Sequence, residues 1–265
     1  MTKIYAFANQ KGGVGKTTSV INLGAYLAAS GRKVLIVDMD PQANATSGFG
    51  FRKEKIHIST YNLLLEQVTP NMAMVTYEAW GLMLLPANPA LAGAEVELVN
   101  VIAREYRLKA ALESVAGDFD YVLIDCPPSL GLLTLNALTA ARDGVLIPVQ
   151  CEYLALEGLS QLVQTIQLVA RHLNAGLRVR GVILTMYDAR TNLSRQVVEE
   201  VRAHFPGQVF RAIIPRNVRL SEAPSFGQPI NQYAPTSPGG LAYQLLAAEL
   251  IKNDYPKTNG REQKG

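Results

Sequence analysis

The chain has 265 residues, of which 48% are hydrophobic, and its formal net charge is +3. This length and composition suit one large folded domain rather than a disordered chain, and no apolar run approaches the roughly 20 residues of a membrane span. The two cysteines, Cys126 and Cys151, are too few for a disulfide framework and form no C-x-x-C motif, so we expect a soluble protein of a reducing compartment without a signal peptide.

Short β-branched runs alternate with amphipathic stretches along the whole chain. This alternation predicts an α/β fold, with a mostly parallel, twisted sheet and helices on both of its faces. Strands are predicted near residues 3–9, 33–38, 82–86, 120–125, 144–149, 180–187 and 209–214. Helices are predicted near residues 16–30, 95–116, 131–141, 155–173, 191–204 and 237–252. We expect a single domain over residues 1–252 and a polar, flexible tail over residues 253–265.

A glycine-rich loop lies between the first predicted strand and the first predicted helix, where residues 9–18 read N-Q-K-G-G-V-G-K-T-T. Glycines let backbone N–H groups turn toward phosphate oxygens, and the following helix presents the positive end of its dipole there. In such a loop Lys16 would reach the β- and γ-phosphates, and the Thr17 hydroxyl would ligate Mg²⁺. The loop therefore predicts nucleotide binding by Lys11, Gly12, Gly13, Val14, Gly15, Lys16, Thr17 and Thr18.

Three aspartates follow or end apolar strands. Asp38 and Asp40 come after the run V-L-I-V, and Asp125 comes after the run Y-V-L-I. Ligands of open α/β sheets bind beyond the carboxyl ends of the strands, where a carboxylate can hold Mg²⁺ or its water beside the phosphates. An aspartate that caps a helix would give the same local pattern, but the glycine-rich loop favours the metal site.

Charge is distributed unevenly along the chain. Residues 1–170 contain 12 Lys and Arg against 15 Asp and Glu, whereas residues 171–265 contain 13 against 7. Every cationic side chain in residues 110–251 is an arginine, whose planar guanidinium binds phosphate with direction as well as charge. This composition suits contact with a polyanion, although a solvated basic face would have the same composition.

Four motifs in the same order resemble the short chromosomal ParA proteins, often called Soj, of the ParA/MinD superfamily. They read K-G-G-V-G-K-T-T at residues 11–18, D-M-D-P-Q at 38–42, I-D-C-P-P-S at 124–129 and P-R-N-V-R-L-S-E-A-P-S at 215–225. The first is similar to the deviant Walker A box of that family, with Gln10 in place of the usual first glycine and Lys11 as an additional lysine. The resemblance spans about residues 3–252. It implies a single-domain P-loop NTPase fold with ATP and Mg²⁺ as cofactors.

The resemblance also implies a homodimer that forms with ATP and encloses two nucleotides between its subunits. Lys11 would reach across to the phosphates of the partner, and Asp40 would position the attacking water. Asp125 would be the Walker B carboxylate, while Asp38 would lie near the Mg²⁺ shell or have a structural role. Residues Pro215, Arg216 and Asn217 would flank the adenine. None of these residues is a strong general base, so we expect slow hydrolysis.

The ATP dimer of this family binds double-stranded DNA without sequence preference and works with a centromere-binding ParB (Spo0J-type) partner. The matching positions here are Arg190 and Arg219, with Arg195 as a neighbour, while Arg216 could serve either DNA or the nucleotide. The resemblance therefore implies an ATPase switch for chromosome or plasmid segregation, in the cytoplasm and associated with the nucleoid.

Three alternatives use the same loop. A MinD-like ATPase acting on a membrane needs an amphipathic C-terminal helix, which the residues after Lys252 do not predict. A relative that positions another cargo would carry the same core motifs. An iron–sulfur reductase or cluster carrier would need ligand cysteines, for which Cys126 beside Asp125 is the nearest candidate.

Overall fold

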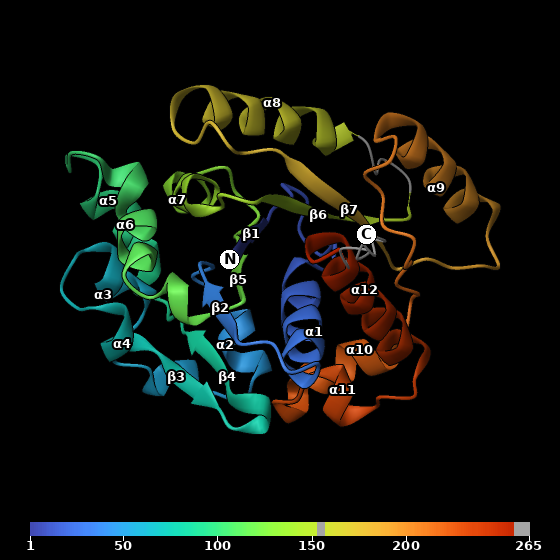
Figure 1. Ribbon diagram of the computed structural model, residues 1–265, viewed down its shortest axis with the longest axis horizontal. Coiled ribbons are helices and arrows are strands. Elements are labelled where there is room, and N and C mark those ends of the chain that lie inside the picture. Colours follow the sequence, from blue (N-terminus) through green and yellow to red (C-terminus); the bar gives the residue numbers. More distant parts are fainter. Residues whose placement is uncertain (153–156, 257–265) are drawn as a thin grey trace, which may run out of the picture.

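A seven-stranded sheet forms the centre of the computed structural model, which describes residues 1–152 and 157–256. The strands follow the order β3-β4-β2-β5-β1-β6-β7, and every pair is parallel except β3–β4 (Figure 1). The strands are β1 (Lys3–Phe7), β2 (Val34–Asp38), β3 (Val75–Tyr77), β4 (Leu82–Leu85), β5 (Tyr121–Asp125), β6 (Gly144–Gln150) and β7 (Val179–Thr185). The predicted α/β fold with a mostly parallel sheet is confirmed.

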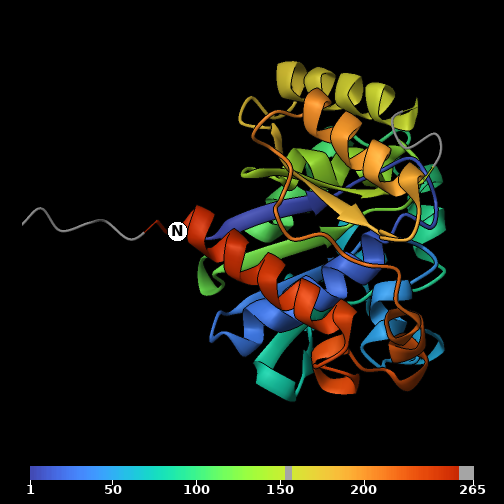
Figure 2. The same ribbon diagram turned by 90° about the vertical axis from the view of Figure 1, so that its right-hand side faces the viewer.

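Helices cover both faces of the sheet, so strand residues are buried on both sides. In β1, Ile4 and Ala6 face one core, while Tyr5 and Phe7 face the other. The first core contains residues of α3 (Thr60–Leu64), α4 (Pro70–Ala73), α5 (Leu91–Glu97), α6 (Arg107–Glu113), α7 (Leu132–Ala140), α8 (Glu157–His172) and α9 (Asn192–His204). The second contains residues of α1 (Lys16–Ala29), α2 (Asn44–Gly48), α10 (Val218–Glu222), α11 (Ile230–Tyr233) and α12 (Pro238–Asp254). Figure 2 shows α1 and α12 side by side on that face.

The structure contradicts two of the secondary-structure predictions. The helix expected over residues 95–116 is two short helices, α5 and α6, because the chain turns between them and Ala103 takes a left-handed conformation with φ of 56°. The strand expected over residues 209–214 is absent, although this segment runs beside β7. It makes two backbone hydrogen bonds, from Phe210 to Val182 and from Ile214 to Leu184, and pairs in an isolated bridge at Val209.

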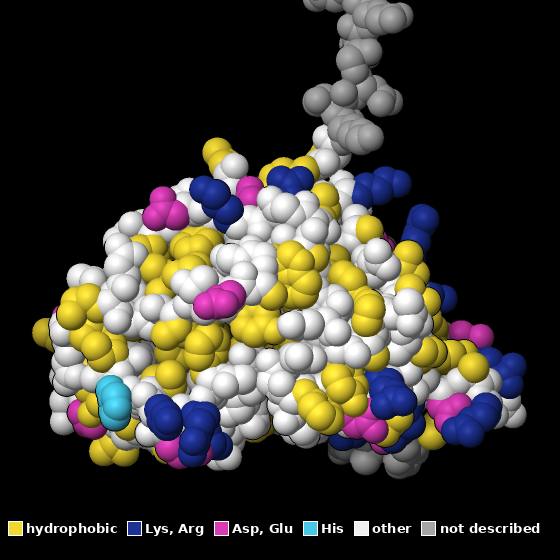
Figure 3. Space-filling model, turned by 90° about the horizontal axis from the view of Figure 1, so that it is seen from below, with side chains coloured by type: hydrophobic (Ala, Val, Ile, Leu, Met, Phe, Trp, Pro, Cys, Tyr) yellow, Lys and Arg dark blue, Asp and Glu magenta, His cyan; other side chains and the backbone are white. Residues whose placement is uncertain are grey.

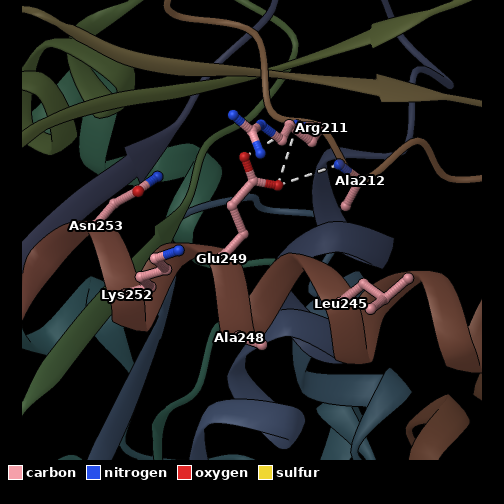
Figure 4. A pocket seen from close by; sticks show the side chains of 7 residues that line it. All are labelled: Arg211, Ala212, Leu245, Ala248, Glu249, Lys252 and Asn253. Carbon is pink, nitrogen blue, oxygen red and sulfur yellow. Dashed lines mark hydrogen bonds between the residues drawn. The ribbon is translucent and has the colours of Figure 1, made fainter. Parts of the chain in front are cut away.

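A carboxylate from α12 explains the missing strand. Glu249 accepts hydrogen bonds from the backbone N–H of Arg211 at 3.0 Å and from that of Ala212 at 3.1 Å (Figure 4). These two N–H groups are therefore not donated to a neighbouring strand, and the ladder is interrupted. Propensity alone does not predict this competition, since the acceptor comes from a helix 37 residues later in the chain.

The last helix extends past the expected end of the domain. α12 continues to Asp254, whose side chain is only 3% exposed. Asp254 Oδ1 accepts hydrogen bonds from Tyr5 Oη at 2.8 Å and from the Arg180 guanidinium at 2.7 Å. The helix end is thus joined to β1 and β7. Residues 257–265 of the expected tail lie outside the described residues. None of the helices within residues 1–152 and 157–256 is long and apolar enough to cross a membrane.

Replacing Glu249 tests its role in the segment beside β7. We expect Glu249→Ala to lower the free energy of unfolding by about 1–3 kcal/mol, because two backbone donors lose a charged acceptor. Urea denaturation monitored by circular dichroism measures this change. Glu200→Ala, at an exposed position of α9, is the control and should change stability by less than about 0.5 kcal/mol. Equal effects of the two substitutions would contradict the assignment.

Candidate functional site

The glycine-rich loop is fastened to the carboxyl ends of three strands. The Asn9 side chain, just after β1, donates from Nδ2 to the carbonyl of Pro148 in β6 at 2.7 Å and accepts from the Lys11 N–H at 3.0 Å. Further along the loop, Thr185 at the end of β7 donates from Oγ1 to the carbonyl of Val14 at 2.8 Å. The loop is therefore held by β6 and β7, the two strands that follow β1 toward one edge of the sheet.

The loop conformation depends on glycines with positive φ. Gly13 has φ of 74° and Gly15 has φ of 87°, values that other residues adopt only with strain. Gly15 is the N-cap of α1, so the unpaired N–H groups and the positive dipole end of a 14-residue helix lie at the loop. This is the geometry that binds phosphate groups.

Lys16 lies inside the loop rather than on the surface. It is 7% exposed, and its Nζ donates to the carbonyl of Lys11 at 3.3 Å. Burial lowers the pKa of the Lys16 ammonium, and the nearby carboxylates of Asp125 and Asp40 act in the opposite direction. Lys11, in contrast, is exposed.

Asp125 and Asp38 lie side by side at the ends of neighbouring strands, because the parallel register of β2 and β5 pairs them. Both are fully buried. Neither carboxylate oxygen of Asp125 has a hydrogen-bond partner among the described residues. Burial, together with the Asp38 and Asp40 carboxylates, raises the pKa of Asp125 well above its ordinary value, while Thr17 and Lys16 counteract the shift.

Asp38 differs from Asp125 because its carboxylate oxygens are hydrogen-bonded. Oδ1 accepts from the Asp40 N–H at 3.1 Å, and Oδ2 accepts from the N–H and the hydroxyl of Thr46 at 2.8 and 2.7 Å. Burial raises the pKa of Asp38 to about 6 in spite of these donors. The hydrogen bonds favour the structural role of Asp38 over the metal-ligand role.

The residues present fit a divalent cation beside the loop. A buried carboxylate without donors is costly unless a cation or a proton neutralises it, and the two free oxygens of Asp125 lie near Thr17 and Lys16. Carboxylate and hydroxyl oxygens are ligands that suit Mg²⁺. Within residues 1–152 and 157–256, no group of three or more His, Cys, Asp or Glu side chains could hold a metal by itself. Cys126 and Cys151 are both free and buried.

A cavity of about 480 Å³ adjoins the loop. One wall consists of Gly15 and Thr18, and another is formed by the predicted adenine-flanking residues Pro215, Arg216 and Asn217. The structure therefore brings the loop and the 215–217 segment to one cavity, although almost 200 residues separate them. Other lining residues are Thr185, Met186, Ile214, Val218, Leu220, Ser221, Pro224 and Tyr243.

Sequence analysis did not identify some of these lining residues. Thr185 ends β7, so the rule that ligands bind beyond the carboxyl ends of strands could have singled it out. Met186, which follows it, has φ of 51°, an uncommon value for a residue with a Cβ. Tyr243 comes from α12 and shares a 3.0 Å hydrogen bond with Ser19 of α1, and no sequence pattern indicates this contact.

The arginines considered for DNA contact, Arg190, Arg195, Arg216 and Arg219, lie at least partly on the surface, and carboxylates pair with three of them. Arg190 donates two side-chain hydrogen bonds to Asp188, at 2.9 and 2.7 Å, and Arg219 pairs with Glu222 at 2.8 Å. Arg195 donates to the Asn192 side chain, and Arg216 pairs with Glu152. Figure 3 shows the same mixture on the face seen from below, where Lys and Arg side chains along the lower rim lie next to Asp and Glu.

The chain is similar over most of its length to proteins of known family. A family model described as an AAA domain matches residues 2–179. The Bacillus subtilis (strain 168) sporulation initiation inhibitor protein Soj is 56% identical over 253 residues, which are 96% of this chain and 100% of that protein. The Myxococcus xanthus chromosome partitioning protein ParA is 55% identical over 259 residues, which are 98% of this chain and 91% of that protein. Among solved structures, cobyrinic acid a,c-diamide synthase from Mycobacterium smegmatis, with a bound ATP analog and magnesium, matches with a TM-score of 0.84 at 43% identity and 96% coverage of each chain.

The two buried aspartates should respond oppositely to substitution by asparagine. Without nucleotide and metal at pH 7, we expect Asp125→Asn to raise the thermal midpoint by a few degrees, because an unpaired buried charge is removed. Asp38→Asn should lower the midpoint, because the amide NH₂ group of asparagine would face an N–H or O–H donor that now bonds to a carboxylate oxygen. Thermal unfolding monitored by circular dichroism measures both.

The effect of Asp125→Asn should depend on pH. Since the folded-state pKa of Asp125 lies above the unfolded value of about 3.8, ionisation costs folding energy at neutral pH but not below pH 4. The stability gained by Asp125→Asn should therefore disappear as the pH falls toward 4. A destabilised Asp125→Asn at pH 7 would contradict this account.

Proposed function

The chain belongs to the Soj/ParA family of chromosome-partitioning ATPases, and we propose that it is a DNA-partitioning switch controlled by bound ATP. One observation carries the proposal: residues of the K-G-G-V-G-K-T-T loop and the 215–217 segment line one cavity of about 480 Å³, and the unpartnered Asp125 lies near Lys16 and Thr17 of the same loop. The relative named chromosome partitioning protein ParA is 55% identical, whereas the structure named as a synthase is 43% identical, so partitioning is preferred.

ATP would bind with its phosphates in the glycine-rich loop and its base in the adjoining cavity. Lys16, already directed into the loop, would neutralise the β- and γ-phosphates. Thr17 and Asp125 would hold Mg²⁺, which supplies charge neutralisation between the phosphate oxygens. Pro215 and Asn217 line the cavity and would flank the adenine.

Hydrolysis would depend on positioning rather than on a strong base. Asp40 is only 7% exposed and lies close enough to Lys16 and Asp125 to influence both. We assign it the role of orienting the attacking water. Phosphoryl transfer needs mainly alignment and charge stabilisation, so slow turnover is expected, with a ParB-type partner as the accelerating factor.

The exposed Lys11 suits a contact between subunits. Its side chain lies outside the loop that encloses Lys16, so it is free to approach the nucleotide of a second copy. ATP would thus join two subunits, and the lysine charge would stabilise the transition state of the partner. Loss of the γ-phosphate would end this contact and release the dimer.

Non-specific DNA binding would follow from dimerisation. The proposed surface of each subunit offers few phosphate contacts, and Asp188 and Glu222 already pair with Arg190 and Arg219. Exposed ion pairs are weak, about 0–1 kcal/mol, so DNA phosphates can replace the carboxylates. Because affinity increases with the number of phosphates neutralised, a dimer with two such surfaces would bind far more tightly than a monomer.

The two loop lysines should have separate effects. We expect Lys16→Ala to reduce ATP affinity at least about a hundredfold, since the charge facing the phosphates is lost. Lys11→Ala should bind ATP nearly as the wild type does and fail to hydrolyse it. Isothermal titration calorimetry and phosphate-release assays measure these properties. A folded Lys16→Ala protein with unchanged ATP affinity would exclude the phosphate-loop assignment.

DNA binding should require ATP and should weaken when a single arginine is replaced. Asp40→Ala should bind ATP, accumulate as a dimer and bind unrelated duplexes equally well, with an affinity that falls steeply with salt. In that background, Arg190→Glu or Arg219→Glu should weaken binding about tenfold for all sequences without affecting dimerisation. Biosensor titrations and light scattering provide the measurements.

Arg202→Glu is the matched control, because it makes the same charge change at the other end of α9. If Asp40→Ala bound DNA equally well with and without ATP, or preferred one duplex over the others, the proposed switch would be refuted. ATP-dependent sedimentation with lipid vesicles instead of DNA would favour the membrane-cycling alternative.

A further inference from the structure

Asp38 and Asp40 lie one residue apart at the end of β2 and have different surroundings. Asp38 is fully buried, and its Oδ1 accepts from the Asp40 N–H while its Oδ2 accepts from Thr46. Asp40 accepts from the Gln42 N–H at 2.9 Å. Asp38 thus fixes the backbone of Asp40 on one side and α2 on the other.

The Thr46 hydroxyl connects three segments of the fold. Thr46 is fully buried in α2, and its Oγ1 donates to Asp38 Oδ2 at 2.7 Å. The same oxygen accepts from the N–H of Ala87, in the turn after β4, at 2.9 Å. Because Thr46 and Ala87 are inaccessible to solvent, water cannot replace either hydrogen bond, and loss of the hydroxyl leaves an unpaired donor and a weakened acceptor.

The turn between Asp40 and Thr46 is held in a strained conformation. Ala43 has φ of 53°, which for a residue other than glycine costs about 1–2 kcal/mol. Its N–H donates to the carbonyl of Asp40 at 2.8 Å, and its side chain is fully buried. Such a conformation persists only where surrounding contacts impose it. The contacts of Thr46 anchor the far end of this turn, and Asp40 stands at its near end.

We propose that Thr46 is a positioning residue for ATP hydrolysis, which keeps the strained turn and the Asp40 carboxylate directed toward the phosphate loop. The inference rests on the proposed role of Asp40 in orienting the attacking water. Thr46 acts through Asp38 and the turn, without a contact of its own to the nucleotide. A small displacement of a catalytic group is sufficient to slow a reaction about a hundredfold, whereas phosphate binding depends on the loop, which Thr46 does not hold.

Thr46→Val tests the proposal, because valine has nearly the same shape and lacks the hydroxyl. We expect kcat to fall at least tenfold while the Kd for ATP stays within about threefold, which is the pattern of a group needed only in the transition state. Thr46→Ser keeps the hydroxyl and should restore most of kcat. If Thr46 had a merely structural role, Thr46→Val would change kcat, the Kd for ATP and stability together. Thr46→Ser would then change kcat and Kd in parallel as well.

Thr139→Val is the matched control, since it removes another buried hydroxyl, bonded at 2.7 Å to Leu135 in α7, and should leave kcat unchanged. Where Thr46→Val fails to fold, Thr46→Cys, with its weak S–H donor, should show the same separation of kcat from Kd. A wild-type kcat in folded Thr46→Val or Thr46→Cys would overturn this inference but not the proposed function. A parallel loss of kcat and ATP affinity would do the same. A wild type that does not hydrolyse ATP would instead overturn the proposed function, and the inference with it.

Discussion

The buried aspartate pair at the ends of β2 and β5 is the constraint on which the rest of the site depends. Parallel pairing of the two strands places Asp38 beside Asp125, and burial of both charges in one place is unfavourable unless each is compensated. The protein compensates them differently. Asp38 receives three donors from its own chain, whereas Asp125 receives none among the described residues. Folding therefore satisfies the Asp38 carboxylate and leaves the Asp125 carboxylate for the cation of the proposed nucleotide site.

The glycine-rich loop is attached by hydrogen bonds that do not involve the aspartate pair. Asn9 and Thr185 fasten it to the carboxyl ends of β6 and β7, and the glycines accept conformations that other residues would not. Strain is present nearby at Ala43 and Met186. Met186 lines the cavity and Ala43 lies in the turn after Asp40, and such conformations persist only where surrounding contacts impose them.

Charges on the surface are screened by water, whereas the charges in the site are buried. The exposed arginines pair with neighbouring carboxylates, and such pairs contribute little stability because water screens them. They are therefore easily exchanged for phosphates of a polyanion. In the proposed switch, weak binding by each subunit is useful, because binding then depends on pairing two subunits and not on any single contact.

The sequence by itself determined the layered α/β fold, the phosphate loop and the aspartates at strand ends, because these features depend on local periodicity, on glycine and on the rule that ligands bind at the carboxyl edge of a parallel sheet. It did not determine which aspartate is hydrogen-bonded, since two of the three donors to Asp38 come from Thr46 in α2, eight residues further along. It also predicted a strand at residues 209–214 that Glu249 prevents, and it placed the end of the domain before Asp254, which is buried against β1 and β7. Only tertiary structure decides such cases, because the partner of a buried charge is chosen by packing between distant segments and not by neighbours in the chain.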